Sequence, residues 1–295
     1  MPSAALLAHS DPHGLVAPHV LRHLSALAEV VDRVVVVSSS PLRPEAEREL
    51  ALHGELVRDV DALGEWSLWR TGIEHLGDQR ALDRVVLADE GLVGPLRPLP
   101  DVLGPPRPGA LRGVTASGPH LSRHLLDVGG DVLRSGPLRA FWTGVGSGLR
   151  AAAAPQLLER NLSRAAAASG WQVEPLFLPS GRDRLRTRGR ALRRELGRAV
   201  TRTGERRAEA LRSVRHPPVR LLDPAAVCWY RALDGALPYV RLDVLVEDPE
   251  GVGRRRMLSA LEQAQPGAMA GVRAHLARVA PEDPARRGAR RGVAA

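Results

Sequence analysis

The 295-residue chain contains no lysine and few aromatic residues. All 42 of its basic residues are arginine, and Phe, Trp and Tyr together make up 3% of the sequence. Proteins that bind single-stranded nucleic acid stack bases on several aromatic side chains, so this composition argues against that class. Hydrophobic residues make up 44% of the chain, which predicts a packed core built mainly from leucine, valine and alanine.

Cysteine and long apolar runs are also scarce. Cys228 is the only cysteine, which excludes an internal disulfide and any metal site that needs several cysteines. A single thiol is compatible with a reducing, cytoplasmic compartment. No run approaches 18 uncharged apolar residues, so no transmembrane helix is expected. The first residues lack a basic start and hold only a short apolar run, so no signal peptide is expected either.

One segment carries the net charge of +9. Residues 180–220 contain 14 arginines and 4 acidic residues, a local charge of +10, which leaves the rest of the chain near −1. This basic insertion has three interpretations. It is a solvated helix without a partner, or it contacts an anionic membrane surface at about 1 kcal/mol per arginine. The third is nucleic-acid binding, which the absence of a recognised motif disfavours.

Strand-like and helix-like segments alternate through the first ninety residues. Short apolar runs predict buried strands, and the segments between them place apolar residues at helical spacing. This alternation favours an α/β fold with a mainly parallel sheet of βαβ units. The predicted strands are 4–8, 33–38, 55–58 and 85–88, and the predicted helices between them are 16–30, 44–53 and 67–76.

The rest of the chain is less regular. Further helices are predicted for 151–170, 254–264 and 268–279, and a strand for 238–244, whereas 120–130 is ambiguous. We therefore expect one domain over residues 1–252, which includes the basic insertion, then C-terminal helices over 253–279. The Pro-, Gly- and Arg-rich residues 280–295 predict a disordered tail.

Two adjacent carboxylates follow a buried strand in residues 84–96, RVVLADEGLVGPL. Open α/β sheets bind ligands outside the carboxyl ends of their strands, and all-oxygen ligands suit Mg²⁺ or Mn²⁺. Asp89 and Glu90 are therefore predicted to hold a divalent cation that neutralises a bound diphosphate. The alternative is a solvated acidic turn, which is common after a strand.

Several stretches, in order, resemble the rhamnan synthesis F family of glycosyltransferases. Residues 6–39 are similar to that family's opening strand, Asp-Pro loop, helix and second strand. Residues 65–72 (EWSLWRTG) resemble its tryptophan box, and residues 89–96 (DEGLVGPL) resemble its Asn-Asp-Ser-x-x-Gly-Pro-Leu box. Weaker similarities follow at 113–115, 138–145, 159–164, 223–229, 238–241 and 248–249.

The resemblance implies a GT-A-like nucleotide-sugar-binding fold. It also implies transfer of a deoxyhexose from a donor of the dTDP-rhamnose type to a lipid-linked or surface glycan, by a cytoplasmic enzyme at the inner face of the plasma membrane. The chain departs from the family pattern at Glu65 and Glu90, each in place of a shorter aspartate, and at Ala226, in place of a histidine. A second hypothesis is therefore a non-catalytic member that binds a partner or a nucleotide sugar.

Four more residues are candidates for the site. Asp11 follows the first strand, where a nucleotide base or ribose is expected, although an Asp-Pro turn explains it equally well. Glu65 and Trp69 are candidates for donor binding, and Glu65 is also a candidate for catalysis. The alternatives are that Glu65 only stabilises the start of a helix, where acidic side chains are favoured, and that Trp69 is a core residue. Glu159 matches the family's helix glutamate and is the candidate base for the acceptor hydroxyl, or an ordinary surface acid.

Overall fold

The computed structural model describes residues 2–78, 81–117, 120–146, 155–187, 189–190, 223–248 and 251–280. Most of the predicted basic insertion and all but the first residue of the predicted tail lie outside these residues.

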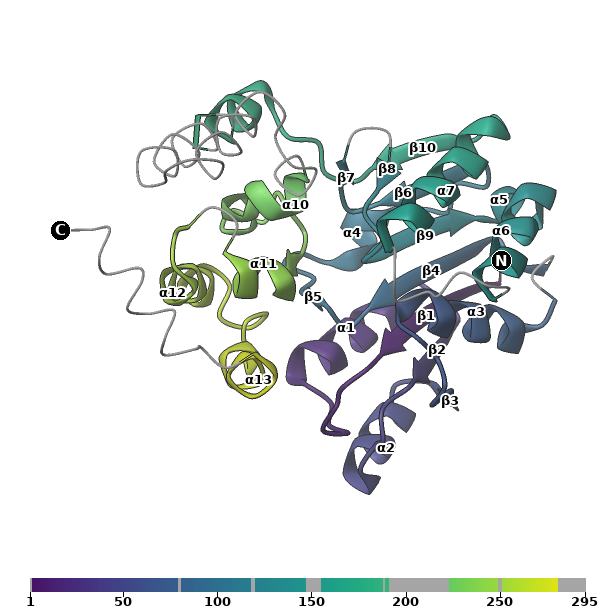
Figure 1. Ribbon diagram of the computed structural model, residues 1–295, viewed down its shortest axis with the longest axis horizontal. Coiled ribbons are helices and arrows are strands. Elements are labelled where there is room, and N and C mark those ends of the chain that lie inside the picture. Colours follow the sequence, from purple (N-terminus) through teal and green to yellow (C-terminus); the bar gives the residue numbers. More distant parts are fainter. Residues whose placement is uncertain are drawn as a thin grey trace, which may run out of the picture.

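A seven-stranded sheet forms the centre of the molecule, in the order β10-β6-β9-β4-β1-β2-β3 (Figure 1). β1 pairs in parallel with β2 and β4, β2 with β3, and β6 with β10. Only β9 runs antiparallel to its neighbours in this sheet, β4 and β6. The prediction of an α/β fold with a mainly parallel sheet is confirmed. The seven strands are β1 Ser3–His9, β2 Arg33–Ser38, β3 Glu55–Arg58, β4 Arg84–Asp89, β6 Ala110–Gly113, β9 Leu125–Gly129 and β10 Gln172–Pro175.

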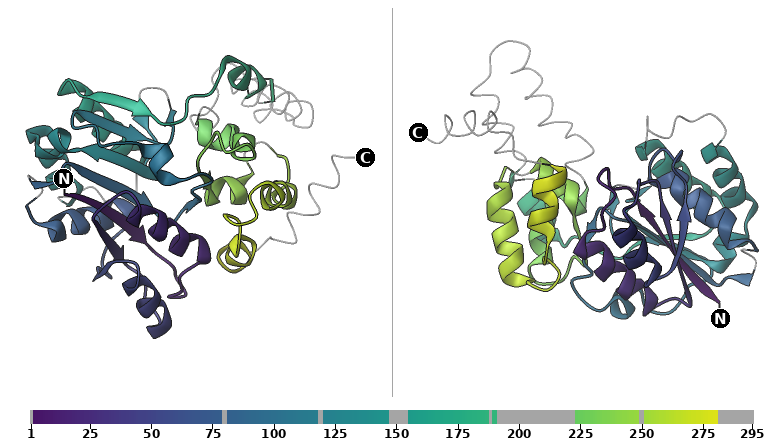
Figure 2. Two further views of the ribbon diagram at one scale, coloured as in Figure 1. Left: turned by 180° about the vertical axis from the view of Figure 1, so that it is seen from behind. Right: turned by 90° about the horizontal axis from the view of Figure 1, so that it is seen from below.

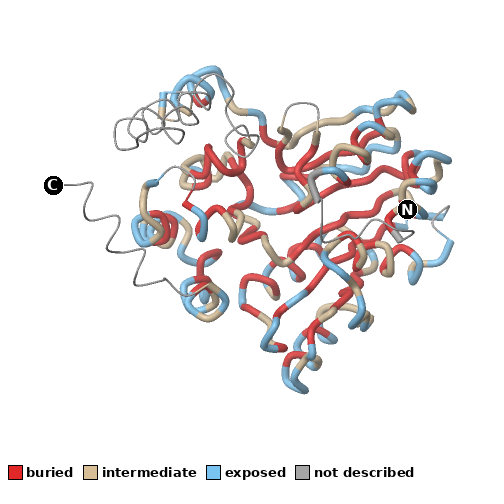
Figure 3. Tube along the Cα trace, in the orientation of Figure 1, coloured by how far each residue is buried: buried red, intermediate tan, exposed pale blue. Residues whose placement is uncertain are grey.

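Helices cover both faces of this sheet. Side chains alternate between the faces of a strand, so Leu7 of β1 joins one hydrophobic cluster with Leu24, whereas Leu6 joins a second cluster with Trp69. The central strands β1, β2 and β4 are therefore buried along nearly their whole length, as Figure 3 shows in red, and they need continuous apolar runs. The helices around the sheet are α1 Pro18–Ala28, α2 Pro44–Ala51, α3 Glu65–Leu76, α4 Leu99–Leu103, α5 Gly130–Arg134, α6 Gly136–Gly146 and α7 Pro155–Ala168.

The C-terminal part of the chain forms a helical lobe beside the sheet (Figure 2). In Figure 1 the arrowheads of β1 and β4 point toward this lobe. Its elements are α10 Pro224–Val227, the 3₁₀ helix η4 Trp229–Ala232, β11 Val240–Arg241, α11 Leu242–Glu247, α12 Arg254–Ala264 and α13 Val272–Val279. Among the described residues, no helix combines the length and apolar character needed to cross a membrane.

Two predictions for this lobe are wrong in extent. The predicted strand 238–244 keeps only the two residues of β11, because Leu242 begins α11. The predicted helix 268–279 begins later, at Val272, because Gly271 adopts a φ of 76°. A Cβ at Gly271 would also lie 2.6 Å from the side chain of Pro18, so the turn before α13 is fitted closely to the start of α1.

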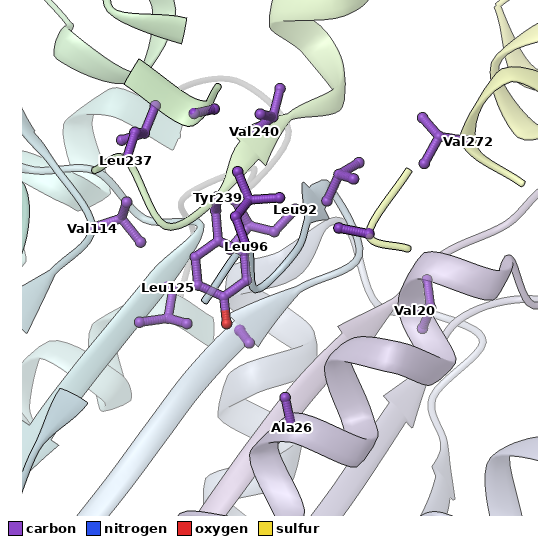
Figure 4. Close-up of a cluster of buried hydrophobic side chains, with 14 of the residues drawn as sticks. Val20, Ala26, Leu92, Leu96, Val114, Leu125, Leu237, Tyr239, Val240 and Val272 are labelled. Carbon is purple, nitrogen blue, oxygen red and sulfur yellow. The ribbon is translucent and has the colours of Figure 1, made fainter. Parts of the chain in front are cut away.

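A tyrosine connects the lobe to the sheet. β11 pairs antiparallel with β5, Leu92–Val93, just after the end of β4. Next to β11, the ring of Tyr239 is fully buried and lies near Leu96 and Leu125 (Figure 4), with its hydroxyl 3.2 Å from His23 Nε2. The apolar faces of α12 and α13 enter the same cluster as α1. A domain boundary at residue 252 stays a prediction.

The start of the basic insertion packs on the lobe. The guanidinium of Arg186 lies 4.0 Å from the centre of the Tyr230 ring, a cation–π contact, and the Tyr230 hydroxyl donates to Asp183 at 2.8 Å. The remaining arginines from residue 191 onward are outside the described residues, so contact of this segment with an anionic membrane stays a prediction.

Candidate functional site

The strand order reverses at β1, between its neighbours β2 and β4. From β1 the chain adds β2 and β3 on one side, then crosses to place β4 on the other side of β1. Open α/β sheets bind ligands where the strand order reverses in this way. His9 is the last residue of β1 and Asp89 the last residue of β4. Asp89 thus belongs to the strand, one residue beyond the predicted end at 88.

The Asp89 carboxylate is held between two donors. Oδ2 lies 2.7 Å from Nδ1 of His124, and Oδ1 accepts a hydrogen bond of 2.9 Å from the backbone N–H of Gly91. Both side chains are buried, and the Asp89 N–H donates to the carbonyl of His124 at 3.1 Å. Burial raises the pKa of Asp89, but the contacts with His124, Arg123 and the Gly91 N–H together outweigh burial and hold that pKa below 3.8.

The second ring nitrogen of His124, Nε2, does not contact Asp89. Because an ionised carboxylate only accepts hydrogen bonds, Asp89 selects the tautomer that carries its proton on Nδ1. His124 Nε2 is buried and has no hydrogen-bond partner among the described residues.

An arginine beside this pair joins two predicted site residues. Arg123 forms ion pairs with Glu65, at the start of α3, and with Glu159 of α7, where Nη1 and Oε1 are 3.2 Å apart. The backbone N–H of Arg123 also donates to Glu159 Oε1 at 3.2 Å. Burial lowers the pKa of Arg123, but Glu65, Asp89 and Glu159 together raise it above its usual value. The structure thus brings Glu65, Glu159 and Asp89 into one charged group.

A second arginine, from the helical lobe, completes this group. Arg241 of β11 forms ion pairs with Asp223 and with Asp243, whose Oδ1 lies 2.9 Å from Arg241 Nε. Asp223 also accepts a 3.2 Å hydrogen bond from Thr115, which follows β6. Each of the two arginines is therefore held between two carboxylates, and the charges come from distant parts of the chain.

Glu90 points away from Asp89. Its Oε2 lies 3.5 Å from His9 Nε2, at the end of β1. Burial raises the pKa of Glu90 well above 4.5, and the nearby charges of Asp89 and Asp11 add to that effect. The two adjacent carboxylates have different partners and do not converge on one cation. Nor does the described part of the chain contain a group of three or more His, Cys, Asp or Glu residues arranged to hold a metal ion.

Helix α13 covers Asp11. One amino group of Arg278 contacts both carboxylate oxygens of Asp11, at 3.0 and 2.7 Å, and Asp11 is 3% exposed. Burial raises the pKa of Asp11, but the hydrogen bonds from Arg278 and from the His13 backbone hold it below 3.8. The neighbouring His275 packs edge-on against His19, with ring centres 5.0 Å apart. The position predicted for a nucleotide base or ribose is thus in contact with the chain's own C-terminal helix.

Replacing Arg278 by methionine is expected to lower the free energy of unfolding by about 1–3 kcal/mol, because the buried Asp11 carboxylate loses its cation. Urea denaturation measures this change. Arg273→Met on the same helix is the matched control, since its ion pair with Glu262 is solvent-exposed and exposed pairs contribute at most about 1 kcal/mol. Equal losses in the two variants would contradict a specific role for the Asp11 contact.

Trp69 does not lie in the site, and the prediction that it binds the donor is wrong in this structure. Its side chain is fully buried, and its Nε1–H donates to the carbonyl of Ala88 at 2.9 Å. The indole packs edge-on against Trp66, which in turn contacts Phe141 and Trp142. These aromatic rings form the core under α3 and α6.

No family model and no curated protein matches the sequence. Solved structures of nucleotide-sugar and nucleotidyl transferases are similar to part of it. One is glucosyl-3-phosphoglycerate synthase from Mycobacterium tuberculosis, in complex with Mn²⁺, UDP and glucosyl-3-phosphoglycerate. It is 12% identical over 44% of this chain, with a TM-score of 0.33, and the match spans 57% of the synthase chain.

Two other similar structures are nucleotidyl transferases. A nucleotidyl transferase from Methanothermobacter matches 59% of this chain and 87% of its own, at 13% identity and a TM-score of 0.35. CMP:2-keto-3-deoxy-manno-octonic acid synthetase, complexed with CTP, matches 59% of this chain and 90% of its own, at 11% identity and a TM-score of 0.37. Matches at this level are partial overlaps of α/β folds, and they assign no site residue in this chain.

Proposed function

We propose that the chain is a glycosyltransferase that uses a nucleoside diphosphate sugar, with its site at the carboxyl ends of β1 and β4. One observation carries the proposal: charged side chains from distant segments gather around Asp89, where the strand order reverses. Burying charged groups costs stability even when they are paired. Perturbed ionisable groups gathered in one place are typical of functional sites.

The chemistry of such a transfer matches what this group contains. The departing diphosphate needs positive charge, the acceptor hydroxyl needs a base, and water has to be kept out. Arg123 and Arg241 are the fixed cations beside Asp89, but both are already paired with carboxylates. A diphosphate therefore needs further positive charge. Mg²⁺ or Mn²⁺ that arrives with the nucleotide stays the predicted source.

Donor and acceptor are proposed from the sequence. The resemblance of residues 6–249 to the rhamnan synthesis F family supports a donor of the dTDP-rhamnose type and a lipid-linked or surface glycan acceptor. A cytoplasmic position at the inner face of the plasma membrane follows from such an acceptor.

A non-catalytic chain that binds a nucleotide sugar is the second candidate. Ala226, in place of the family's histidine, is buried beside Val227 in the lobe's apolar core and offers no polar group. The contact of α13 with Asp11 also favours a site that holds a ligand without turning it over.

Titration calorimetry with UDP, dTDP, GDP and CDP, with and without Mn²⁺, tests the proposal. At least one diphosphate is expected to bind, and the matching nucleotide sugar should be hydrolysed slowly in the absence of an acceptor. Asp89→Ala is expected to slow that hydrolysis by about 100-fold or more. The matched control is Asp131→Ala, because Asp131 is exposed at the start of α5, on the opposite edge of the sheet.

The outcomes separate the candidates. If none of the four diphosphates binds, the main proposal and the second candidate both fail. If a diphosphate binds but no donor is hydrolysed, the non-catalytic candidate is favoured.

A further inference from the structure

We infer that His124 is the catalytic base of this site and that Asp89 is its positioning residue. The inference rests on the proposed function and specifies which group accepts the proton of the acceptor hydroxyl. It assigns Asp89, predicted as a cation ligand, to the orientation of an imidazole instead.

The geometry of the dyad leaves one ring nitrogen ready for chemistry. Asp89 holds His124 Nδ1 at 2.7 Å, and Gly91 and the β4 backbone hold Asp89 in turn. A carboxylate that fixes the Nδ1–H tautomer leaves the Nε2 lone pair of a neutral imidazole free to accept a proton. His124 Nε2 has no partner among the described residues, although it is buried. A buried polar atom without a partner costs stability, which a role in binding or catalysis explains.

The other carboxylates of the group are poorer bases. Glu65 and Glu159 both face Arg123, and Glu159 also accepts the Arg123 backbone N–H. Asp223 and Asp243 are likewise paired with Arg241. A carboxylate that neutralises a guanidinium has its lone pairs engaged by that partner. Glu159, the predicted base, is therefore replaced in that role by His124.

The acceptor hydroxyl gives its proton to His124 Nε2 while its oxygen forms a bond to the anomeric carbon of the donor. The bond from that carbon to the diphosphate oxygen breaks, and its electron pair leaves with the diphosphate. The proton on Nε2 then passes to solvent, which restores the neutral imidazole.

Hydrolysis of a nucleotide sugar by the full chain tests the dyad, with dTDP-rhamnose and UDP-glucose as probes and water as acceptor. His124→Ala is expected to lower kcat by about 100- to 10,000-fold with little change in the Kd for the nucleoside diphosphate. Added imidazole should restore part of the rate in His124→Ala but not in the unaltered chain. Asp89→Asn should lower kcat and displace the pH–rate profile, because it removes the charge that orients the ring.

Matched variants separate chemistry from folding. His53→Gln is the histidine control, because His53 lies before the amino end of β3, away from the site, and it should leave the rate unchanged. If His124→Ala does not fold, the nearly isosteric His124→Gln serves in its place, and thermal unfolding confirms that each variant is native.

Several results would overturn the dyad. One is a native His124 variant that hydrolyses the donor at the unaltered rate. Another is a native His124→Ala that imidazole does not rescue while Glu159→Gln abolishes turnover, because that assigns the base to Glu159. A chain that binds a diphosphate but hydrolyses neither probe also overturns the dyad, whereas the absence of any nucleotide binding overturns the proposed function and the dyad with it.

Discussion

Replacing Asp127 by alanine is expected to lower the free energy of unfolding by about 3–5 kcal/mol. Asp127 lies in β9, 3% exposed, between two arginines of neighbouring strands. Arg84 reaches its two oxygens through Nε at 2.7 Å and Nη2 at 3.1 Å, and Arg112 contacts Oδ2. Without the carboxylate, two buried guanidinium groups face each other uncompensated, and neither can lose its proton near neutral pH. Urea denaturation measures the loss.

Two comparisons show whether burial and charge cause this loss. Glu174→Ala breaks the Arg107–Glu174 ion pair, which is exposed on β10, and is expected to cost at most about 1 kcal/mol. Replacing all three buried groups together, as Arg84→Met, Arg112→Met and Asp127→Leu, should be far less costly than Asp127→Ala, because no unpaired charge remains. A single-site loss below about 1 kcal/mol would contradict this account of the buried triad.

The same triad shows why part of the sheet could not be predicted. β1, β2 and β4 are continuous apolar runs because both of their faces are buried, and such runs are visible in a sequence. β9 contains a charged residue, so its sequence LLDVG gave an ambiguous pattern over 120–130. The partners that neutralise Asp127 come from β4 and β6. Their pairing is a long-range property that local periodicity does not contain.

The candidate site, too, could be predicted only in part. Asp89 and Glu90 could be placed at the end of a strand, because an apolar run followed by carboxylates is a local pattern. The partner of Asp89 could not be found, because His124 is 35 residues away and faces Asp89 only through the antiparallel direction of β9. A single histidine in an ambiguous segment carries no local signal. Asp11 and Arg278 are 267 positions apart, so the cover over Asp11 was also invisible in the sequence.

Lowering the pH from 7 to 5 is expected to destabilise the protein by about 3 kcal/mol, through three buried histidines next to the sheet. His9, His19 and His23 are at most 1% exposed, and burial lowers the pKa of each from 6.5 to about 4. Their hydrogen-bond partners, Ser38, the Glu90 carbonyl and Tyr239, are uncharged. The Glu90 carboxylate lies 3.5 Å from His9 Nε2, but its raised pKa favours its own uncharged form.

The direction of this pH effect follows from the number of protons that the folded and unfolded chains bind. Between pH 6.5 and 4 the unfolded chain binds protons at these histidines that the folded chain does not, so stability is complete above pH 6.5 and is lost as the pH falls toward 4. Each histidine contributes a loss of about 2 kcal/mol between pH 7 and 5. Glu90 acts in the opposite direction, because its raised pKa favours the folded chain at low pH. It offsets part of the combined loss of the three histidines, which leaves a net loss of about 3 kcal/mol or more.

Thermal unfolding at pH 7 and pH 5 measures the effect, and a loss of about 3 kcal/mol corresponds to a lower midpoint by about 6–12 °C. His23→Gln should remove roughly 2 kcal/mol of the pH dependence, because glutamine can keep a hydrogen bond to the Tyr239 hydroxyl without taking up a proton. His53→Gln should leave the pH dependence unchanged, because His53 lies near the surface with an exposed partner, Ser25. If His23→Gln has the same pH dependence as the unaltered chain, His23 is not a source of the loss. Asp89 and Asp11 cannot supply that loss instead, because their lowered pKa values place their effect below about pH 4.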